Sequence, residues 1–304
     1  MTVKESSKFI MPLFTVLLFL LVVMFAGCTN DDEKPEEDAD GWNNLSKMQK
    51  DIKSSLPYKF RFLSNTSNAE NILSPSDSIL FLLGLDSAIS PEERISLIEY
   101  VKKGGTLVFA SDREDLAEPF TRYFRIRYYD HRLIDTSYTY NWDFITTKSD
   151  FFGTEMNLLF NGPRGLNVTD SGEGMNDSHE GPVDLDDEPI EDENIALMMA
   201  SSPVVVKDLQ ITSYSFIDMN DNENQDNWDL DGPIGMGYRV KKGNGQVYIF
   251  GNSGLFINDM YNRADNREFI HKMMSSSISD QGTVYFDITH HSSERSQHLG
   301  YSGG

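Results

Sequence analysis

The sequence predicts an α/β fold with a mostly parallel sheet, and residues 78–112 carry most of that prediction. Two apolar runs of strand length, 79–83 and 106–110, flank a segment in which apolar residues recur at helical spacing. Buried strands joined by an amphipathic helix form a crossover unit, in which the strands are parallel and the connection is right-handed.

The helix inside this crossover unit carries signals at both of its ends. Ser90 is a candidate N-cap, Pro91 occupies the first helical position, and Glu93 completes a capping box. Gly104-Gly105 ends the helix before the second strand begins. These signals fix where the chain changes from strand to helix and back.

Further elements are predicted along the chain from periodicity and turn residues. Helices are expected at 44–56, at 115–124 and from the 251–254 turn through 274. Strands are expected at 58–63, 126–129, 155–160, 213–217, 246–250 and 283–287, and residues 138–144 are expected to be extended. Apolar character returns at 195–199 and 203–206. Residues 42–291 are therefore expected to form one α/β domain with a sizeable core.

The N-terminal 28 residues predict an export signal that ends at a lipidation site. Lys4 and Lys8 precede an apolar run at 9–26, and the lipobox-like sequence Phe25-Ala26-Gly27-Cys28 follows. The alternative is an uncleaved membrane helix, because the run is barely long enough to span a bilayer. Both interpretations place the domain on the extracytoplasmic face of the cell membrane.

Three segments outside the core of the domain are distinguished by composition. Residues 29–41 form an acidic tether without apolar periodicity, and residues 292–304 form a C-terminal tail. Residues 170–193 are rich in acids and contain no Lys or Arg, which indicates a long acidic loop inserted into the domain.

Charge and cysteine usage exclude several classes of function. The formal net charge is −22, from 48 acidic and 26 basic residues, which argues against nucleic acid and anionic lipid surfaces as partners. Cys28 is the only cysteine, so an intramolecular disulfide, a thiolate zinc cluster and a thiol nucleophile within the domain are all excluded.

The acidic segment 218–231 resembles a calcium-binding loop. Candidate ligands at the first, third, fifth and ninth positions are Asp218, Asn220, Asn222 and Asp226. Two positions depart from the pattern, since Glu223 stands where such a loop needs Gly and the last position is Asp instead of Glu. The sequence leaves open a calcium site or an acidic, solvated loop. The pair His290-His291 is interpreted as a surface or partner-facing pair.

The crossover unit and the segment after residue 232 together resemble the DUF4350 family. The matching pieces are Tyr100-Val-Lys-Lys-Gly-Gly-Thr-Leu, Ser111-Asp112, Asp231-Gly232-Pro233, Gly245-Gln-Val-Tyr-Ile-Phe-Gly-Asn252, Leu255-Phe-Ile-Asn-Asp-Met and Val284-Tyr-Phe-Asp-Ile-Thr-His-His291. The resemblance implies a flavodoxin-like sheet with helices on both faces, as in class I glutamine amidotransferases. It also implies an exported or membrane-tethered protein, common in archaea, whose partners belong to a MoxR-type ATPase system.

These observations favour a non-catalytic, lipid-anchored binding or scaffold domain. Ligands of open α/β sheets bind at the carboxyl ends of parallel strands, so the residues expected there are Asp112, Asn252 and Ser253. One alternative is a hydrolase of surface polymers that uses carboxylates near Asp112, with Asp259 as the second acid. Another is a calcium-dependent interaction module built on the 218–231 loop.

Overall fold

The computed structural model describes residues 45–136, 144–149, 152–162, 164–168, 204–210 and 215–291. The predicted signal, Cys28, the tether, the acidic insertion and the C-terminal tail lie outside these ranges, as does most of the extended segment expected at 138–144. Within the ranges, no helix has the length and apolar character needed to cross a membrane.

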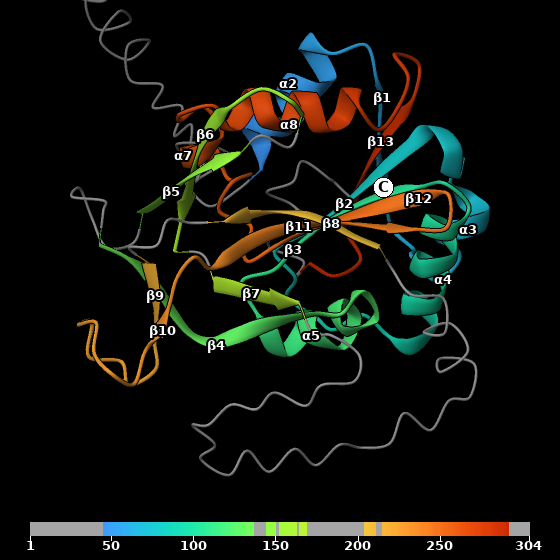
Figure 1. The fold of residues 1–304 in the computed structure, drawn as a ribbon. Coiled ribbons are helices and arrows are strands. Elements are labelled where there is room, and N and C mark those ends of the chain that lie inside the picture. Colours follow the sequence, from blue (N-terminus) through green and yellow to red (C-terminus); the bar gives the residue numbers. More distant parts are fainter. Residues whose placement is uncertain are drawn as a thin grey trace, which may run out of the picture. The chain divides into compact units, whose positions relative to one another are not determined.

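One half of the main sheet is parallel and contains the predicted crossover unit (Figure 1). Its five strands are β1 (Lys59–Leu63), β2 (Ser78–Leu83), β3 (Thr106–Ala110), β12 (Gly245–Phe250) and β13 (Thr283–Asp287). They lie in the order β1–β13–β2–β3–β12 and every neighbouring pair is parallel. By position along the chain the order is 1-5-2-3-4, which differs from the doubly wound orders 3-2-1-4-5-6 and 2-1-3-4-5.

The other half of the sheet is antiparallel, so the prediction of a mostly parallel sheet is wrong. In the described residues its strands are β4 (Ile126–Asp135), β7 (Arg164–Val168), β8 (Val204–Gln210), β9 (Ser215–Asp218), β10 (Leu230–Asp231) and β11 (Gly235–Lys242). All six take part only in antiparallel pairings, and β11 joins this half to β12. A separate hairpin consists of β5 (Phe144–Ser149) and β6 (Met156–Asn161).

The change from antiparallel to parallel pairing occurs across β12, which pairs antiparallel with β11 and parallel with β3. Lys242 pairs with Gly245, so Gly243-Asn244 reverses the chain, and Gly243 has a φ of 60°. A reversal of two residues can join only antiparallel strands. The sequence analysis missed β11 because Gly235 and Gly237 interrupt its alternating apolar pattern.

Helices cover both faces of the parallel half, as the family resemblance implies (Figure 1). The helices are α2 (Ser46–Ser55), α3 (Ala69–Ile72), α4 (Pro91–Lys102), α5 (Glu114–Thr121), α7 (Asn258–Tyr261) and α8 (Asn266–Ser275). Successive residues of β2 point to opposite faces. Phe81 belongs to the core packed by α2, α7 and α8, whereas Leu80 and Leu82 belong to the core packed by α3, α4 and α5.

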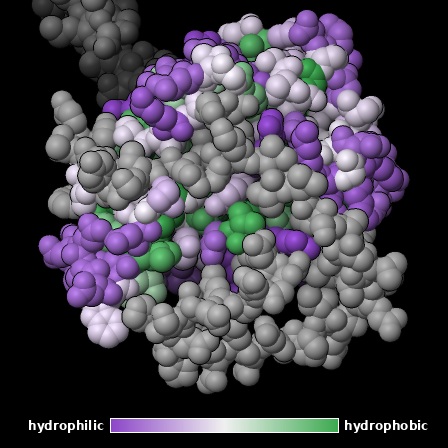
Figure 2. Space-filling view, in the orientation of Figure 1, coloured by the Kyte–Doolittle hydropathy of each residue, from purple (hydrophilic) through white to green (hydrophobic). Residues whose placement is uncertain are grey.

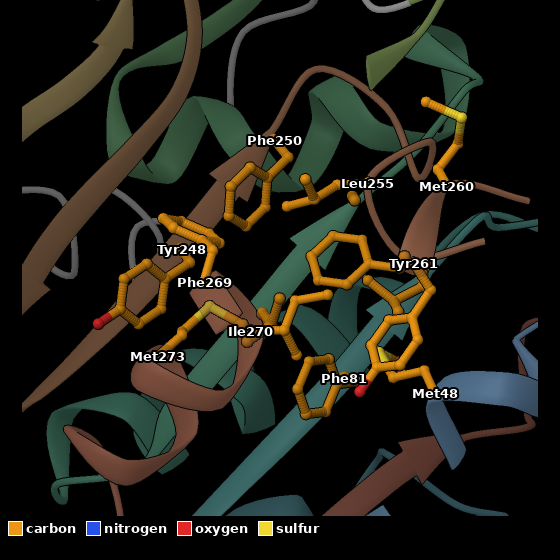
Figure 3. Close-up of a cluster of buried hydrophobic side chains, with 14 of the residues drawn as sticks. Met48, Phe81, Tyr248, Phe250, Leu255, Met260, Tyr261, Phe269, Ile270 and Met273 are labelled. Atoms are coloured by element: carbon orange, nitrogen blue, oxygen red, sulfur yellow. The ribbon is translucent and has the colours of Figure 1, made fainter. Parts of the chain in front are cut away.

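The core under α2, α7 and α8 combines aromatic residues and methionines with aliphatic side chains (Figure 3). The rings of Phe250 and Phe256 meet edge to face with centroids 5.3 Å apart, and Phe81 stacks on Phe286 at 4.9 Å. Met48 of α2 and Phe269 of α8 are fully buried in the same cluster. This packing holds the helices against the sheet and fixes where the strands end.

Candidate functional site

The carboxyl ends of β3 and β12 bring Asp112 and Ser253 into direct contact. The two strands are parallel neighbours with Ala110 opposite Phe250, so the residues that follow them meet at one edge of the sheet. The backbone N–H of Ser253 donates to Asp112 Oδ1 at 3.1 Å, and its hydroxyl donates to Oδ2 at 2.6 Å. One carboxylate therefore ties together the ends of two strands.

The side chain of Asn252 is buried and stabilises the turn after β12. Its side-chain amide donates to the carbonyl of Asn161, and its carbonyl accepts the N–H of Gly254 at 3.0 Å. The preceding Gly251 allows close approach to β7, because a Cβ there would lie 2.0 Å from the carbonyl oxygen of Arg164. The side chain of Asn252 and the close approach of Gly251 to Arg164 therefore hold this turn in place.

Tyr128 adds a buried phenol to this edge. Its hydroxyl donates to the carbonyl of Phe250 at 3.1 Å. Burial raises the pKa of Tyr128, and the negative charge of Asp112 raises it further, so the phenol remains protonated and able to donate.

The edge presents Asp112 as its exposed polar group, while Asn252 and Ser253 are only 4% and 2% exposed. Asp259, the second acid considered for hydrolysis, lies on α7 and pairs with Arg263 at 3.0 Å. Each carboxylate thus has a partner of its own. The geometry offers an accessible carboxylate on a fixed turn, which suits binding.

A second polar cluster, missed by the sequence analysis, lies where β13 approaches α4. His290 is buried with Nδ1 2.9 Å from Asp287 and Nε2 3.3 Å from Glu93. The other oxygen of Glu93 accepts the hydroxyl of Thr66, while the backbone N–H of Ser90 donates to Glu93 Oε2 at 2.9 Å. The predicted capping box is therefore present, and the same Glu93 also anchors the end of β13.

The charges in this cluster stabilise one another. Burial lowers the pKa of His290, but its hydrogen bond to Asp287 and the nearby Glu93 outweigh that effect and raise it above the usual value. Burial would raise the pKa of Glu93, yet the hydroxyl of Thr66, the groups of Ser90 and the charge of His290 lower it to about 2. The interpretation of His290 as a surface residue is therefore wrong, because strand β13 ends at Asp287 and the chain turns the imidazole inward.

The predicted calcium loop is closed by hydrogen bonds among its own residues. Asp218 is buried, and its carboxylate accepts the N–H groups of Asn222 at 3.2 Å and Glu223 at 2.8 Å. Asn220 and Asn222 both donate to Asp226 Oδ2 at 2.9 Å. All four candidate ligands thus lie in one connected network.

Glu223 takes the backbone conformation that calcium loops normally assign to glycine. Its φ is 60°, in the left-handed region, although a side chain is present. The carboxylate of Glu223 pairs with Arg132 at 2.9 Å. In the described ranges, no three His, Cys, Asp or Glu side chains are grouped so that they could hold a metal ion, so the candidate ligand set depends on the amides of Asn220 and Asn222.

A third cluster joins α2 to α8 through Asp51. Its carboxylate accepts from Tyr261 at 2.7 Å and from Arg267 at 2.7 and 2.8 Å, and it lies 2.8 Å from His271 Nε2. Burial raises the pKa of Asp51, but these hydrogen bonds outweigh it and hold the pKa well below the usual range.

An open pocket of about 440 Å³ adjoins this cluster, lined by Leu56, Tyr58, Arg267, Glu268, His271, Lys272 and Ser275. Because Tyr58 precedes β1 and Ser275 ends the helix that leads to β13, the pocket lies near the amino ends of these strands, away from Asp112.

Comparison with known proteins gives one family match. Residues 64–274 match the model described as "Domain of unknown function (DUF4350)". No curated protein matches the chain.

Solved structures resemble the chain only distantly. The structure "mmIFT52 N-terminal domain" has 10% sequence identity and a TM-score of 0.49, over 77% of this chain and 90% of that chain. Two structures of Gan42B, a GH42 β-galactosidase, one of them a catalytic mutant from G. stearothermophilus, have 14% identity and TM-scores of 0.29 and 0.28. Each of these two matches spans 65% of this chain and 21% of the β-galactosidase chain.

Proposed function

This chain belongs to the DUF4350 family, and we propose that it is a non-catalytic, lipid-anchored binding or scaffold domain on the extracytoplasmic face of the cell membrane. The anchor is Cys28, and the ligand or partner contacts the strand edge at Asp112, Asn252 and Ser253. The sheet with helices on both faces is related to the flavodoxin-like fold of class I glutamine amidotransferases. We extend the archaeal, membrane-tethered setting of the family to this protein.

The observation that carries this proposal is the contact between Asp112 and Ser253. A serine nucleophile needs a base that removes its proton, and in the common triads that base is an imidazole. Here the hydroxyl of Ser253 donates to a carboxylate, and its described contacts include no imidazole. Amidotransferase chemistry needs a thiol, and Cys28 precedes the domain. Among the described residues, the edge therefore presents groups that can hold a ligand and no imidazole or thiol in contact with Ser253.

The experiment is a turnover assay on the purified full-length protein with amide, ester and glycoside substrates. We expect no turnover above the buffer rate, with Asp112→Ala and wild-type protein giving the same result. Turnover by the wild-type protein that Asp112→Ala abolishes would contradict a non-catalytic role and favour the hydrolase alternative.

The partners we propose are membrane proteins associated with a MoxR-type ATPase system, and they do not include nucleic acid. The charge of −22 supports the second part, since a nucleic acid backbone would be repelled. Crosslinking in intact membranes followed by mass spectrometry tests the first part. Recovery of the MoxR-associated proteins supports it, and their absence from crosslinks that do capture other membrane proteins contradicts it.

A calcium-dependent interaction module is a second candidate, favoured by the left-handed backbone of Glu223. Calcium binds oxygen ligands from carboxylates, amides and carbonyls, so Asp218, Asn220, Asn222 and Asp226 form a chemically suitable set. Calorimetric titration with calcium tests this role, with Asp226→Ala as the variant that lacks one ligand. Binding that this variant weakens supports the site, and no heat of binding at millimolar calcium rejects it.

A further inference from the structure

Among the described side chains, the large apolar ones that are exposed all belong to residues 219–230, which comprise the loop between β9 and β10 and the first residue of β10. The exposed fraction is 43% for Met219, 67% for Trp228 and 42% for Leu230. Apolar side chains that gather at one exposed place mark an interaction site more often than scattered ones do.

The three side chains belong to two arms of the loop that lie next to each other. Leu230 pairs with Ile217 in the β9–β10 ladder, and the N–H of Met219 donates to Asp229 Oδ1 at 3.0 Å. Trp228 lies two residues before Leu230 in one arm, and Met219 directly follows β9 in the other. The hydrogen bond between Met219 and Asp229 holds the two arms together, so the three exposed side chains lie at one end of the loop, and we call them the apolar tip.

The backbone that carries Trp228 is held by hydrogen bonds on both sides. Its N–H donates to Asp226 Oδ1 at 2.8 Å, and the N–H of Asp226 donates to Asp229 Oδ2 at 2.7 Å. A large aromatic side chain on a fixed backbone loses little conformational freedom on binding. Tryptophan is also the residue type most enriched among those that dominate binding energies.

The acidic residues around the apolar tip limit which partners can bind there. Residues 219–231 contain five acids and no Lys or Arg, and Figure 2 shows a strongly hydrophilic surface where Figure 1 places this loop. Arg132 pairs with one of these acids, Glu223, at 2.9 Å. A second copy of this chain or an anionic membrane would be repelled, whereas a cationic surface would be attracted.

We propose that Met219, Trp228 and Leu230 form a docking surface for a basic, apolar segment of another protein. The apolar side chains of that segment cover Trp228, and its Lys or Arg residues lie against the surrounding acids. This surface shares no side chain with the strand edge at Asp112, so it does not depend on the function proposed for that edge. It also needs no calcium, because the hydrogen bonds that shape the loop all lie within the chain.

The test uses a labelled synthetic peptide of alternating Lys and Leu, titrated with the full-length protein and followed by fluorescence anisotropy. We expect saturable binding that Trp228→Ala weakens about tenfold or more. Asp221→Asn, which removes one charge and keeps a residue tolerant of the left-handed φ of 55°, should weaken binding about twofold. Glu92→Gln on α4 is the matched charge control and should leave binding unchanged.

Two further peptides separate the contributions of charge and apolar contact. A Glu–Leu peptide and a Lys–Ser peptide should both bind much more weakly than the Lys–Leu peptide. Failure of the Lys–Leu peptide to bind wild-type protein overturns the proposal. Equal affinity for wild-type protein, Trp228→Ala and Glu92→Gln also overturns it, because attraction to the overall negative charge would then explain the binding.

Discussion

The Nδ1 atom of His290 lies 2.9 Å from a carboxylate oxygen of Asp287, and both side chains are buried. The other ring nitrogen faces Glu93, the third residue of α4 and a member of its capping box. An imidazole between two carboxylates therefore connects the end of the last parallel strand to the start of the crossover helix. We call this group the His290 cluster.

Removing the imidazole should destabilise the domain strongly. His290→Ala leaves Glu93 and Asp287 buried without their shared cation, and breaking a buried ion pair costs about 3–5 kcal/mol. Urea unfolding followed by circular dichroism measures the change. His131→Ala on β4 is the histidine control and should change the free energy of unfolding by less than about 0.5 kcal/mol. Equal losses for the two variants would contradict the role assigned to His290.

The same cluster should give the domain a stability maximum in mildly acidic solution. The folded pKa of His290 is raised, so its contribution is fully present below the unfolded value of about 6.5 and is lost as the pH rises through the folded pKa. The pKa of Glu93 is lowered to about 2, so its contribution is present above the unfolded value of about 4.5 and is lost as the pH falls toward 2.

Thermal melts across this pH range measure both limbs of the stability curve. His290→Gln should flatten the alkaline limb, and Glu93→Gln should flatten the acidic limb. The assignment fails if His290→Gln keeps the full alkaline decline of the wild-type protein.

The contact between Asp112 and Ser253 should appear as a coupling energy. Ser253→Ala removes the hydroxyl donor but keeps the backbone donor, so we expect a loss of about 1–2 kcal/mol in the free energy of unfolding. Asp112→Ala removes the acceptor of both bonds and should cost more. In a double-mutant cycle by urea unfolding, strictly additive losses would show that the two side chains do not interact in solution.

Gly251 should tolerate no Cβ atom, for steric reasons alone. An added methyl would lie 2.0 Å from the carbonyl oxygen of Arg164, so Gly251→Ala must displace β7 and should cost about 2 kcal/mol or more. Gly162→Ala is the control, because its φ is 54° but nothing lies within 4 Å of the new atom. There we expect only the left-handed penalty of about 1 kcal/mol. Thermal melting measures both variants. A smaller loss of stability for Gly251→Ala than for Gly162→Ala would show that the turn moves to accommodate the added methyl group.

The parallel half of the fold could be predicted because β2 and β3 are continuous apolar runs, β1 alternates between polar and apolar residues, and the crossover helix has signals at both ends. The antiparallel half could not, since Gly235 and Gly237 hide the pattern of β11 and the pairing of distant strands leaves no local trace. Asp112 and Ser253 were found because both follow buried strands, and parallel strands end at a common edge. The His290 cluster was missed because Glu93, Asp287 and His290 meet only after the chain has folded.

The most direct test of the proposed anchored domain is mass spectrometry of its N-terminal peptide from the membrane fraction. We expect a mature chain that begins at Cys28 and carries lipid there, with two acyl chains because one chain holds a protein only weakly. Cys28→Ser should remove the lipid and leave the apolar run at 9–26 uncleaved. A wild-type protein with an intact Met1 and an unmodified Cys28 would contradict the lipid anchor and show that residues 9–26 remain as a membrane helix.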